Sequence, residues 1–253
     1  MFTDTHCHLS KEDYDDIDAV IERAKDNKVD RLIICGCDKK SIIESIDIAN
    51  TYDNVYLEIG FHPSEANITT EEDIKWLDDL ITNNKKVVAV GEIGLDYHWD
   101  KDNKDKQKEL FNRMIDLSIK HKLPVLIHSR DAFQDTYDIL KERGVRGDIH
   151  CFSGNLDNAK MFIDLGFVLG VGGVLTFKNT NLKETIKSIP LDKIILETDA
   201  PYLSPEPFRG KQNEPKNVYY VAETLSNLTG KSLNDISSIT EDNTNKLFFD
   251  KID

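Results

Sequence analysis

Several features are absent from this sequence of 253 residues. It has no apolar run long enough to cross a bilayer, and it does not begin with a basic, apolar leader that ends in small residues. We therefore expect a cytoplasmic protein that does not associate with membranes. No linker, low-complexity tract or charge block interrupts the chain, so we expect residues 1–253 to form a single domain.

Cysteine is also scarce. The four cysteines, Cys7, Cys35, Cys37 and Cys151, all lie in apolar surroundings, which predicts reduced, buried thiols rather than disulfides. The pair Cys35 and Cys37, separated by one glycine, lacks the spacing of a zinc or redox pair. We therefore do not count these thiols among the candidate ligands.

An excess of positive charge is missing as well. The chain has 46 acidic and 32 basic residues, which gives a formal net charge of −14. Such a charge disfavours broad electrostatic attraction to nucleic acid or to anionic membranes. An enzyme that meets phosphate through bound cations and a few local basic residues stays compatible with it, because metal charge dominates such a site.

The sequence does contain a regular alternation of apolar runs and amphipathic segments. The predicted strands cover residues 2–6, 31–35, 55–59, 87–91, 124–128, 148–151, 167–171 and 193–197. The predicted helices cover 14–27, 40–50, 70–83, 104–121, 133–143, 155–165, 182–188, 218–228 and 233–249. Strands that alternate with helices imply parallel βα units, and eight such units close an α/β (β/α)8 TIM barrel. A doubly wound open sheet is the alternative.

Metal-binding side chains lie at the carboxyl ends of these apolar runs. They are His6, His8, Glu92, His128, His150 and Asp199. In a parallel barrel the carboxyl ends of the strands meet at one rim, where active sites are built. An open sheet would instead spread the six side chains along a crevice. Four imidazoles and two carboxylates gathered at a rim predict a site for divalent metal, with room for two ions, and therefore an enzyme.

The two histidines of the first run carry the most specific local signal. Residues i and i+2 of a strand point to the same side, so His6 and His8 place two imidazoles side by side. Either His128 or His150 alone would more often be a hydrogen-bonded core residue. It is the occurrence of all six side chains at strand ends that favours ligands.

The two carboxylates are the candidate catalytic residues. Glu92 lies between glycines, which let the backbone approach a site closely, and its two oxygens can bridge two cations. Asp199 directly follows an apolar strand, so it can bind metal and accept a proton from an activated water. Asp199 can also cap a following turn, since Pro201 suits the first turn of a helix, and the two roles can coexist.

Seven ordered motifs around these positions resemble the TatD family of metal-dependent hydrolases, which belongs to the amidohydrolase-like barrels. They are Asp-Thr-His-Cys-His-Leu at 4–9, Gly-Phe-His-Pro at 60–63, Gly-Glu-Ile-Gly-Leu-Asp-Tyr at 91–97, His-Ser-Arg-Asp at 128–131, His-Cys-Phe-Ser-Gly at 150–154, Glu-Thr-Asp-Ala-Pro-Tyr-Leu at 197–203 and Arg-Gly-Lys-Gln-Asn-Glu-Pro at 209–215. The resemblance covers the whole chain. It implies a (β/α)8 barrel with a binuclear metal site and deoxyribonuclease activity, often as a 3′→5′ exonuclease on single strands.

The resemblance also implies how the ligands divide between two ions. His6, His8, Glu92 and Asp199 would hold one ion, and Glu92, His128 and His150 would hold the other. Imidazole and carboxylate ligands suit Zn, Mn, Fe, Co or Ni, whereas nuclease activity in the family is usually discussed with Mg. We expect a transition metal in the purified protein and Mg or Mn during turnover.

Four further residues are candidates for binding substrate. Arg130 can fork onto a phosphate or pair with Asp131, and His62 can donate to a phosphate or make a buried structural hydrogen bond. Arg209 and Lys211 follow the eighth strand, where barrels often bind phosphate, but they can equally be ordinary surface residues. Base stacking on Tyr202 or Phe61 is a further possibility, although aromatic side chains in barrels usually pack.

Single-stranded DNA is therefore the expected substrate, and no obligate protein partner is inferred, so a monomer is the default. The alternative is a metal-dependent hydrolase of amide, lactone or ester bonds, such as an aminoacyl-tRNA deacylase. The metal ligands do not discriminate between the two, because the same activated water attacks carbon or phosphorus. The basic residues at the rim favour phosphate. A non-catalytic metal-binding protein is disfavoured, because all six candidate ligands and a potential base are present.

Overall fold

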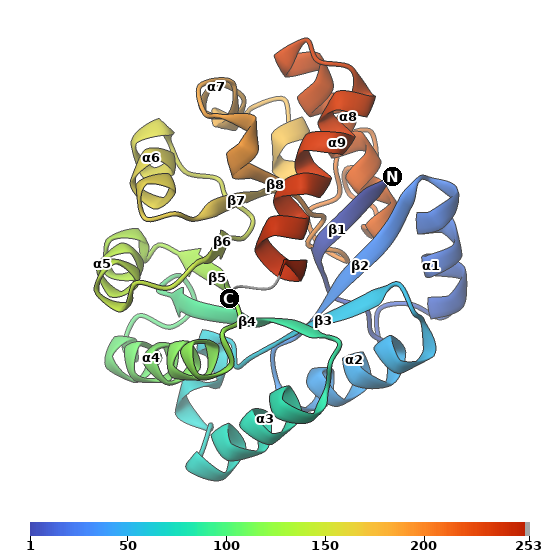
Figure 1. The fold of residues 1–253 in the computed structure, drawn as a ribbon. Coiled ribbons are helices and arrows are strands. Elements are labelled where there is room, and N and C mark those ends of the chain that lie inside the picture. Colours follow the sequence, from blue (N-terminus) through green and yellow to red (C-terminus); the bar gives the residue numbers. More distant parts are fainter. Residues whose placement is uncertain (251–253) are drawn as a thin grey trace.

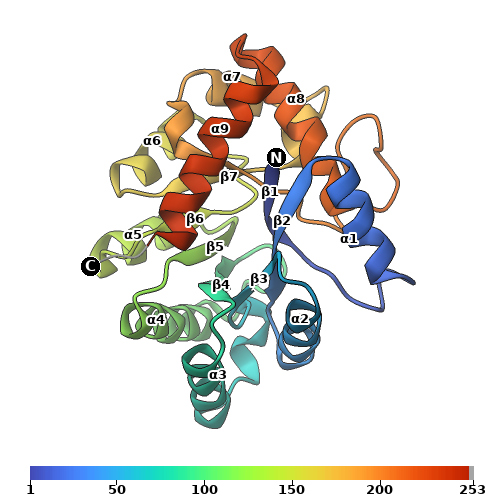
Figure 2. The same ribbon diagram turned by 45° about the vertical axis from the view of Figure 1, so that its right-hand side comes forward.

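Eight parallel strands form one sheet that curves round on itself in the computed structural model, which describes residues 1–250. They follow one another in sequence order around the sheet, and Figures 1 and 2 show the helices outside the ring of strands. The strands are β1 (Phe2–Cys7), β2 (Val29–Gly36), β3 (Val55–Ile59), β4 (Val87–Asp96), β5 (Val125–Arg130), β6 (Gly147–Ile149), β7 (Val168–Val171) and β8 (Ile194–Leu196).

The ring is closed between the first and the last strand. The His8 amide donates to the Ala200 carbonyl at 2.6 Å, and the Asp199 amide donates to the His6 carbonyl at 3.0 Å. Cys7 and Ala200 form a parallel bridge just beyond β8. The predicted (β/α)8 barrel is therefore confirmed, and an open sheet is excluded.

The helices lie close to the predicted ranges. They are α1 (Ile17–Asp26), α2 (Lys39–Thr51), α3 (Glu71–Asn83), α4 (Lys104–His121), α5 (Phe133–Arg143), α6 (Leu156–Asp164), α7 (Leu182–Lys187), α8 (Val218–Thr229) and α9 (Leu233–Thr244). Short 3₁₀ turns add η1 (Pro63–Asn67), η2 (Gly173–Thr176), η3 (Leu191–Lys193) and η4 (Pro215–Asn217). The first helix begins three residues later than 14–27 suggested, because the Asp16 side chain caps it by accepting from the Ala19 amide. No helix within residues 1–250 is long and apolar enough to span a membrane.

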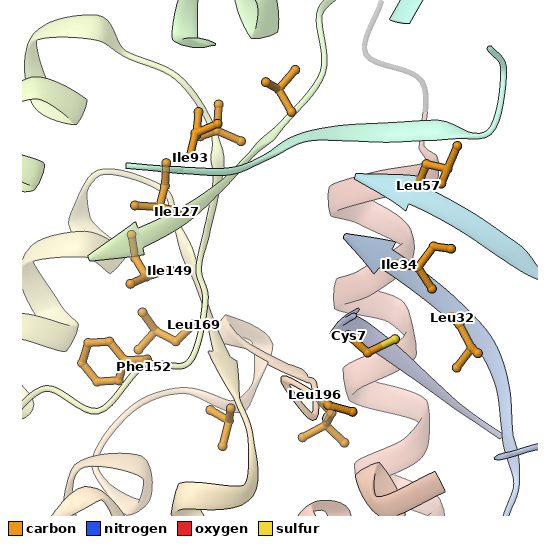
Figure 3. Packing of buried hydrophobic residues seen from close by; sticks show 14 of the residues in the cluster. Cys7, Leu32, Ile34, Leu57, Ile93, Ile127, Ile149, Phe152, Leu169 and Leu196 are labelled. Carbon is orange, nitrogen blue, oxygen red and sulfur yellow. The ribbon is translucent and has the colours of Figure 1, made fainter. Parts of the chain in front are cut away.

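The main hydrophobic core, called the outer core from here on, lies between the strands and the surrounding helices. Each strand contributes aliphatic side chains that alternate with residues facing the barrel interior. Figure 3 labels one or two such side chains from successive strands: Leu32, Ile34, Leu57, Ile93, Ile127, Ile149, Leu169 and Leu196. This continuous apolar shell holds the strand ends in a fixed arrangement.

A second, smaller hydrophobic cluster, called the plug from here on, lies inside the barrel. It joins Ile33 of β2, Ala89 of β4 and Ile195 of β8 to Leu247 and Phe248. These strands are not neighbours in the sheet, so their side chains can meet only across the barrel interior. Ala89 precedes Glu92 and Ile195 precedes Asp199 along the chain, so the plug lies toward the amino-terminal end of the barrel from these candidate ligands.

The chain segment that supplies this plug differs from the prediction. We expected one helix over residues 233–249, but α9 ends at Thr244 and a π-helical segment, η5 (Asn245–Phe249), follows it. Leu247 and Phe248 of this segment pack into the inner cluster. The chain thus changes from α-helix to π-helix in the same segment that packs into the plug.

The fourth strand is also longer than predicted, and it contains an irregularity at its centre. It runs to Asp96, whereas the sequence suggested an end at Gly91. Val90 pairs with Val125 and Ile93 with Ile127, so β4 has one extra residue here relative to β5. Such a bulge turns a side chain to the other face of the sheet. Val90 and Ile93 both face the outer core, and Glu92 between them faces the interior.

The backbone of β4 packs closely against that of β5 at Gly94. Its φ of +142° lies in the region that favours glycine, and an added Cβ would lie 2.0 Å from the His128 carbonyl oxygen. We expect Gly94→Ala to lower the free energy of unfolding by at least about 2 kcal/mol, as measured by urea denaturation.

Gly172→Ala is the matched control, because a Cβ there meets its nearest atoms at an ordinary 3.5 Å. We expect it to change stability by less than about 1 kcal/mol. Equal effects of the two substitutions would show that β4 and β5 separate easily at this point.

Candidate metal centre

Four of the predicted ligands converge at the carboxyl-terminal rim of the barrel. The Asp199 Oδ1 atom lies 3.4 Å from His6 Nε2 and 3.5 Å from His8 Nε2. Glu92 Oε2 lies 4.0 Å and 3.8 Å from the same two nitrogens. The closing of β1 against β8 and the bulge in β4 thus bring together side chains from three separate strand ends.

The spacing of these four atoms suits a cation between them. Four ligand atoms bonded at about 2.1 Å in a tetrahedron lie about 3.4 Å from one another. His6 Nε2 is buried and has no hydrogen-bond partner among residues 1–250, although a buried ring nitrogen normally has one. The residues present therefore fit a divalent metal ion.

The second oxygen of Glu92 faces a different pair of histidines. Glu92 Oε1 lies 2.6 Å from His128 Nδ1 and 3.0 Å from His150 Nε2. The carboxylate consequently separates two imidazole pairs and presents one oxygen to each.

The electrostatics of the site favour positive charge. Burial lowers the pKa of His8, but hydrogen bonds to Asp199 and Cys37 outweigh burial and raise that pKa to about 10. Burial would raise the pKa of Glu92, but the two histidines beside its Oε1 hold that pKa well below its usual range. The carboxylates are thus held ionised, and their negative charge favours a positive charge at the imidazoles, which a metal ion could supply in place of a proton.

Glu58 of β3 was not among the predicted site residues. Its Oε1 atom bonds to His6 Nδ1 in a wholly buried contact, which leaves His6 Nε2 directed at the candidate ion. A carboxylate behind a ligating imidazole fixes its tautomer and strengthens it as a ligand. The sequence could have indicated this role, because a glutamate inside an apolar strand needs a polar or charged partner.

Asp96 was missed for a different reason. Its Oδ2 atom lies 3.2 Å from His128 Nε2, and hydrogen bonds from that ring and from the His98 and Trp99 amides lower its pKa to about 2 against the effect of burial. Glu92, Gly94 and Asp96 share one face of β4. The predicted strand ended at Gly91, so this alternation was not followed far enough.

The burial of the cysteines also differs in part from the prediction. All four cysteines are free, and Cys7 and Cys35 are buried, but Cys37 and Cys151 are only partly so. Cys37 lies at the rim beside His8, and the ligand atoms of His8, Cys35 and Cys37 all lie within 4.8 Å of one another. The expectation of buried thiols was therefore wrong for Cys37 and Cys151.

The ligands open into a pocket of about 510 Å³. The pocket is lined by His8, Cys37, His62, Glu92, Asp96, Trp99, His128, Arg130, His150, Asp199, Tyr202 and Leu203. Its volume is in the range of small-molecule binding sites, about 300–1,000 Å³. Two predicted substrate-binding residues, His62 and Arg130, are thus placed at the site.

The contacts of His62 and Arg130 help to decide between a role in binding phosphate and a purely structural role. His62 Nδ1 accepts a hydrogen bond from the Ser64 amide at 3.1 Å, and its ring lies 4.7 Å from that of His128. Asp131 pairs with His98 rather than with Arg130, at 3.1 Å. Within residues 1–250, Arg130 forms no salt bridge, so an ion pair does not account for it.

The other predicted substrate-binding residues lie elsewhere. Arg209 and Lys211 are exposed and are not among the residues that line the pocket; the Arg209 guanidinium lies 3.8 Å from the centre of the Phe177 ring. A role for either in substrate binding stays a prediction. Phe61 is only 2% exposed and belongs to the outer core, so base stacking on it is excluded.

The contact between Glu58 and His6 leads to a prediction about metal affinity. We expect Glu58→Gln to weaken divalent metal binding about tenfold, because His6 loses the charge that orients it and strengthens it as a ligand. Calorimetric titration of chelator-stripped protein measures the change. Glu22→Gln, on the exposed side of α1, should leave the affinity unchanged. An affinity equal to that of the unaltered protein would remove Glu58 from the support of the site.

Comparison with known proteins agrees with this geometry. A family model described as TatD related DNase matches residues 3–249. The chain is 47% identical over 253 residues to a protein of Bacillus subtilis named uncharacterized metal-dependent hydrolase YabD, covering 98% of this chain and 99% of that one. It is 35% identical to the uncharacterized metal-dependent hydrolase YcfH of Escherichia coli K12, covering 98% and 96% of the two chains.

Solved structures show the same relationship. The crystal structure of YjjV, a TatD homologue from Escherichia coli K12, matches with a TM-score of 0.92 at 30% identity and covers 99% of this chain and 98% of that one. A hydrolase of the TatD family from Entamoeba histolytica matches with a TM-score of 0.89 at 26% identity and covers 98% of both chains. The match of the family model along nearly the whole chain, together with these relatives, shows that the chain belongs to the TatD-related DNase family.

Proposed function

We propose that this protein is a divalent-metal-dependent deoxyribonuclease that hydrolyses phosphodiester bonds, with single-stranded DNA as substrate and 3′→5′ polarity. Membership of the family and the names of its relatives support the broader statement that it is a metal-dependent hydrolase. The choice of DNA, of the exonuclease mode and of two ions is the further step. It rests on the site geometry and on the family description.

The observation that carries the proposal is the position of Glu92. One of its oxygens faces His6 and His8, and the other faces His128 and His150. A carboxylate placed between two imidazole pairs supports a binuclear site. Two-metal sites are common among nucleases and phosphatases, which displace an oxygen leaving group in line.

Bound ions of this kind would lower the pKa of water and stabilise charge on phosphate oxygens. The chain's own contribution begins with Asp199, whose carboxylate lies between the two β1 histidines. Burial would raise the pKa of Asp199, but the two neighbouring imidazoles lower it and keep the carboxylate ionised. It can therefore accept the proton from the attacking water. Glu92 holds the two halves of the site at a fixed separation.

Arg130 favours phosphate over a carbonyl substrate. It lines the pocket, and no carboxylate within residues 1–250 pairs with it. A guanidinium with free donors can bind phosphate oxygens in a bidentate manner. Because the whole chain carries a net charge of −14, attraction to DNA must come from such local groups and from the bound metal ions.

Hydrolysis of an amide, lactone or ester is the alternative outcome, and cleavage assays separate it from the proposal. End-labelled single-stranded DNA is incubated with chelator-stripped protein, and Mg, Mn or Zn is restored separately. We expect metal-dependent shortening from the 3′ end. Intact DNA, in protein that rebinds metal, would overturn the proposal and favour carbonyl substrates.

Glu92→Ala is the first variant for this assay. Loss of the bridging carboxylate should lower both metal content and DNA cleavage by at least about 100-fold, since even partners in the outer coordination shell are worth 10- to 100-fold. Metal content is measured by elemental analysis and cleavage by gel electrophoresis. The control is Glu184→Ala on α7, whose exposed carboxylate pairs with Lys187 and with no other basic residue among residues 1–250. Retention of two metal ions by Glu92→Ala would contradict the bridging role.

Arg209 lies outside the pocket, and its contribution can be measured through salt dependence. If it contacts a backbone phosphate, Arg209→Ala should weaken single-stranded DNA binding and reduce the slope of log affinity against log salt by about 0.7, with metal content intact. Fluorescence anisotropy at several salt concentrations provides the measurement. Lys246→Ala, in η5 at the opposite end of the barrel, is the matched control. An unchanged slope would limit Arg209 to its stacking on Phe177.

A further inference from the structure

Trp99 is a large exposed side chain at the rim of the metal pocket. Its side chain is 77% exposed, and it lines the pocket together with the candidate ligands. Leaving an indole in water forgoes the stabilisation that burial of its apolar area would give. The other tryptophan of the chain, Trp76, lies on α3 and packs partly buried against the outer core. Trp99 therefore differs from an ordinary core aromatic.

The indole is held in place from its backbone. The Trp99 and His98 amides both donate to Asp96 Oδ1, at 3.1 and 2.8 Å. The other oxygen of Asp96 lies 3.2 Å from His128 Nε2. One carboxylate thus connects the backbone of the Trp99 turn to a candidate ligand, which anchors the main chain that bears the indole close to the candidate metal centre.

Neighbouring side chains add a cation to this aromatic surface. The Arg130 guanidinium lies 5.4 Å from the centre of the Trp99 ring, within the range of a cation–π contact. The His98 ring meets the indole edge to face, with ring centres 4.9 Å apart. With these contacts made, Trp99 is still 77% exposed and contributes to the lining of the pocket.

We propose that Trp99, with Arg130 beside it, forms a stacking site for a base near the cleaved end of a single DNA strand. Every base has a flat π face that stacks on an aromatic ring, and the adjacent phosphate offers a negative charge to the guanidinium. The rest of the pocket is lined mainly by histidine, carboxylate and arginine side chains. An apolar protein surface would have to desolvate these groups, whereas a nucleotide is complementary to both the ring and the charges.

The proposal deepens the proposed function and rests on it, since it names a site for the base of that substrate. The role that it assigns to Trp99 is base binding, which can be measured without cleavage of the strand. A base that stacks on an indole quenches its fluorescence, and with two tryptophans in the chain each signal can be assigned by substitution. Binding and cleavage can therefore be measured separately.

The experiment uses the Mg²⁺-loaded protein and short phosphorothioate-linked strands that resist cleavage. One strand is oligothymidine, and the other has the same length and backbone but no bases. We expect oligothymidine to quench tryptophan emission and the abasic strand to leave it nearly unchanged. Trp76→Phe should keep the quenching, and Trp99→Phe should lose it.

Affinity gives a second readout. Trp99→Ala should bind oligothymidine about 5- to 100-fold more weakly, because stacking on an aromatic residue is worth about 1–3 kcal/mol per base. Its affinity for the abasic strand should not change. Trp99→Phe, which retains a smaller ring, should bind with an intermediate affinity.

Equal quenching by both strands, quenching that survives in Trp99→Phe, or no binding of oligothymidine at all would overturn the stacking site. Failure of the nuclease proposal would look different. In that case oligothymidine would quench Trp99, while ordinary DNA stayed intact with every metal tested. Cleavage of DNA without base-dependent quenching would leave the nuclease and remove the stacking site.

Discussion

The closing of the barrel between β1 and β8 is the constraint on which the candidate site depends. The first and last strands are joined through main-chain bonds from the Asp199 amide to the His6 carbonyl and from the His8 amide to the Ala200 carbonyl. These bonds seal the sheet and also bring Asp199 within 3.5 Å of both β1 histidines. Residues from the first strand and from just beyond the last strand thereby share one candidate metal site. Opening the barrel between β1 and β8 would separate these candidate ligands even if every one of them were kept.

Beneath the ligands, the barrel interior contains a layer of buried carboxyl groups rather than the branched aliphatic residues usual in such barrels. Its members are Asp4, Glu58, Asp148 and Glu197, each 0% exposed. Burial raises the pKa of all four, and that of Asp4 to about 7, because a buried carboxylate loses the hydration that stabilises its charge. Glu58 supports His6, whereas both oxygens of Asp148 lack a hydrogen-bond partner within residues 1–250.

This arrangement places stability and function in different layers. The aliphatic shell between strands and helices and the plug of Leu247 and Phe248 bury apolar surface, which favours folding. The interior and the rim instead contain polar groups whose burial opposes folding unless they are paired. The apolar layers therefore offset the cost of a site built from ionisable residues.

The sequence alone determined the order of elements and which candidate ligands lie at the strand ends. Apolar runs at regular spacing predict eight βα units, and the side chain that follows each run must then reach the same rim. Alternation along a strand predicts that His6 and His8 point the same way. These features follow from local chemistry and from the periodicity of single elements, so no contact between distant residues was needed to find them.

Tertiary structure decided the contacts between those elements. The bulge that turns Glu92 inward depends on the register between β4 and β5. The contact of Asp96 with His128 depends on the same pair of strands, and the contact of Glu58 with His6 depends on how β3 lies relative to β1. The exposure of Trp99 and the position of Cys37 beside His8 likewise depend on how loops settle around the rim. Such relations join residues far apart in the chain, and no local pattern records them. The sequence therefore determined which side chains reach the rim, and the folded barrel decided what each of them touches there.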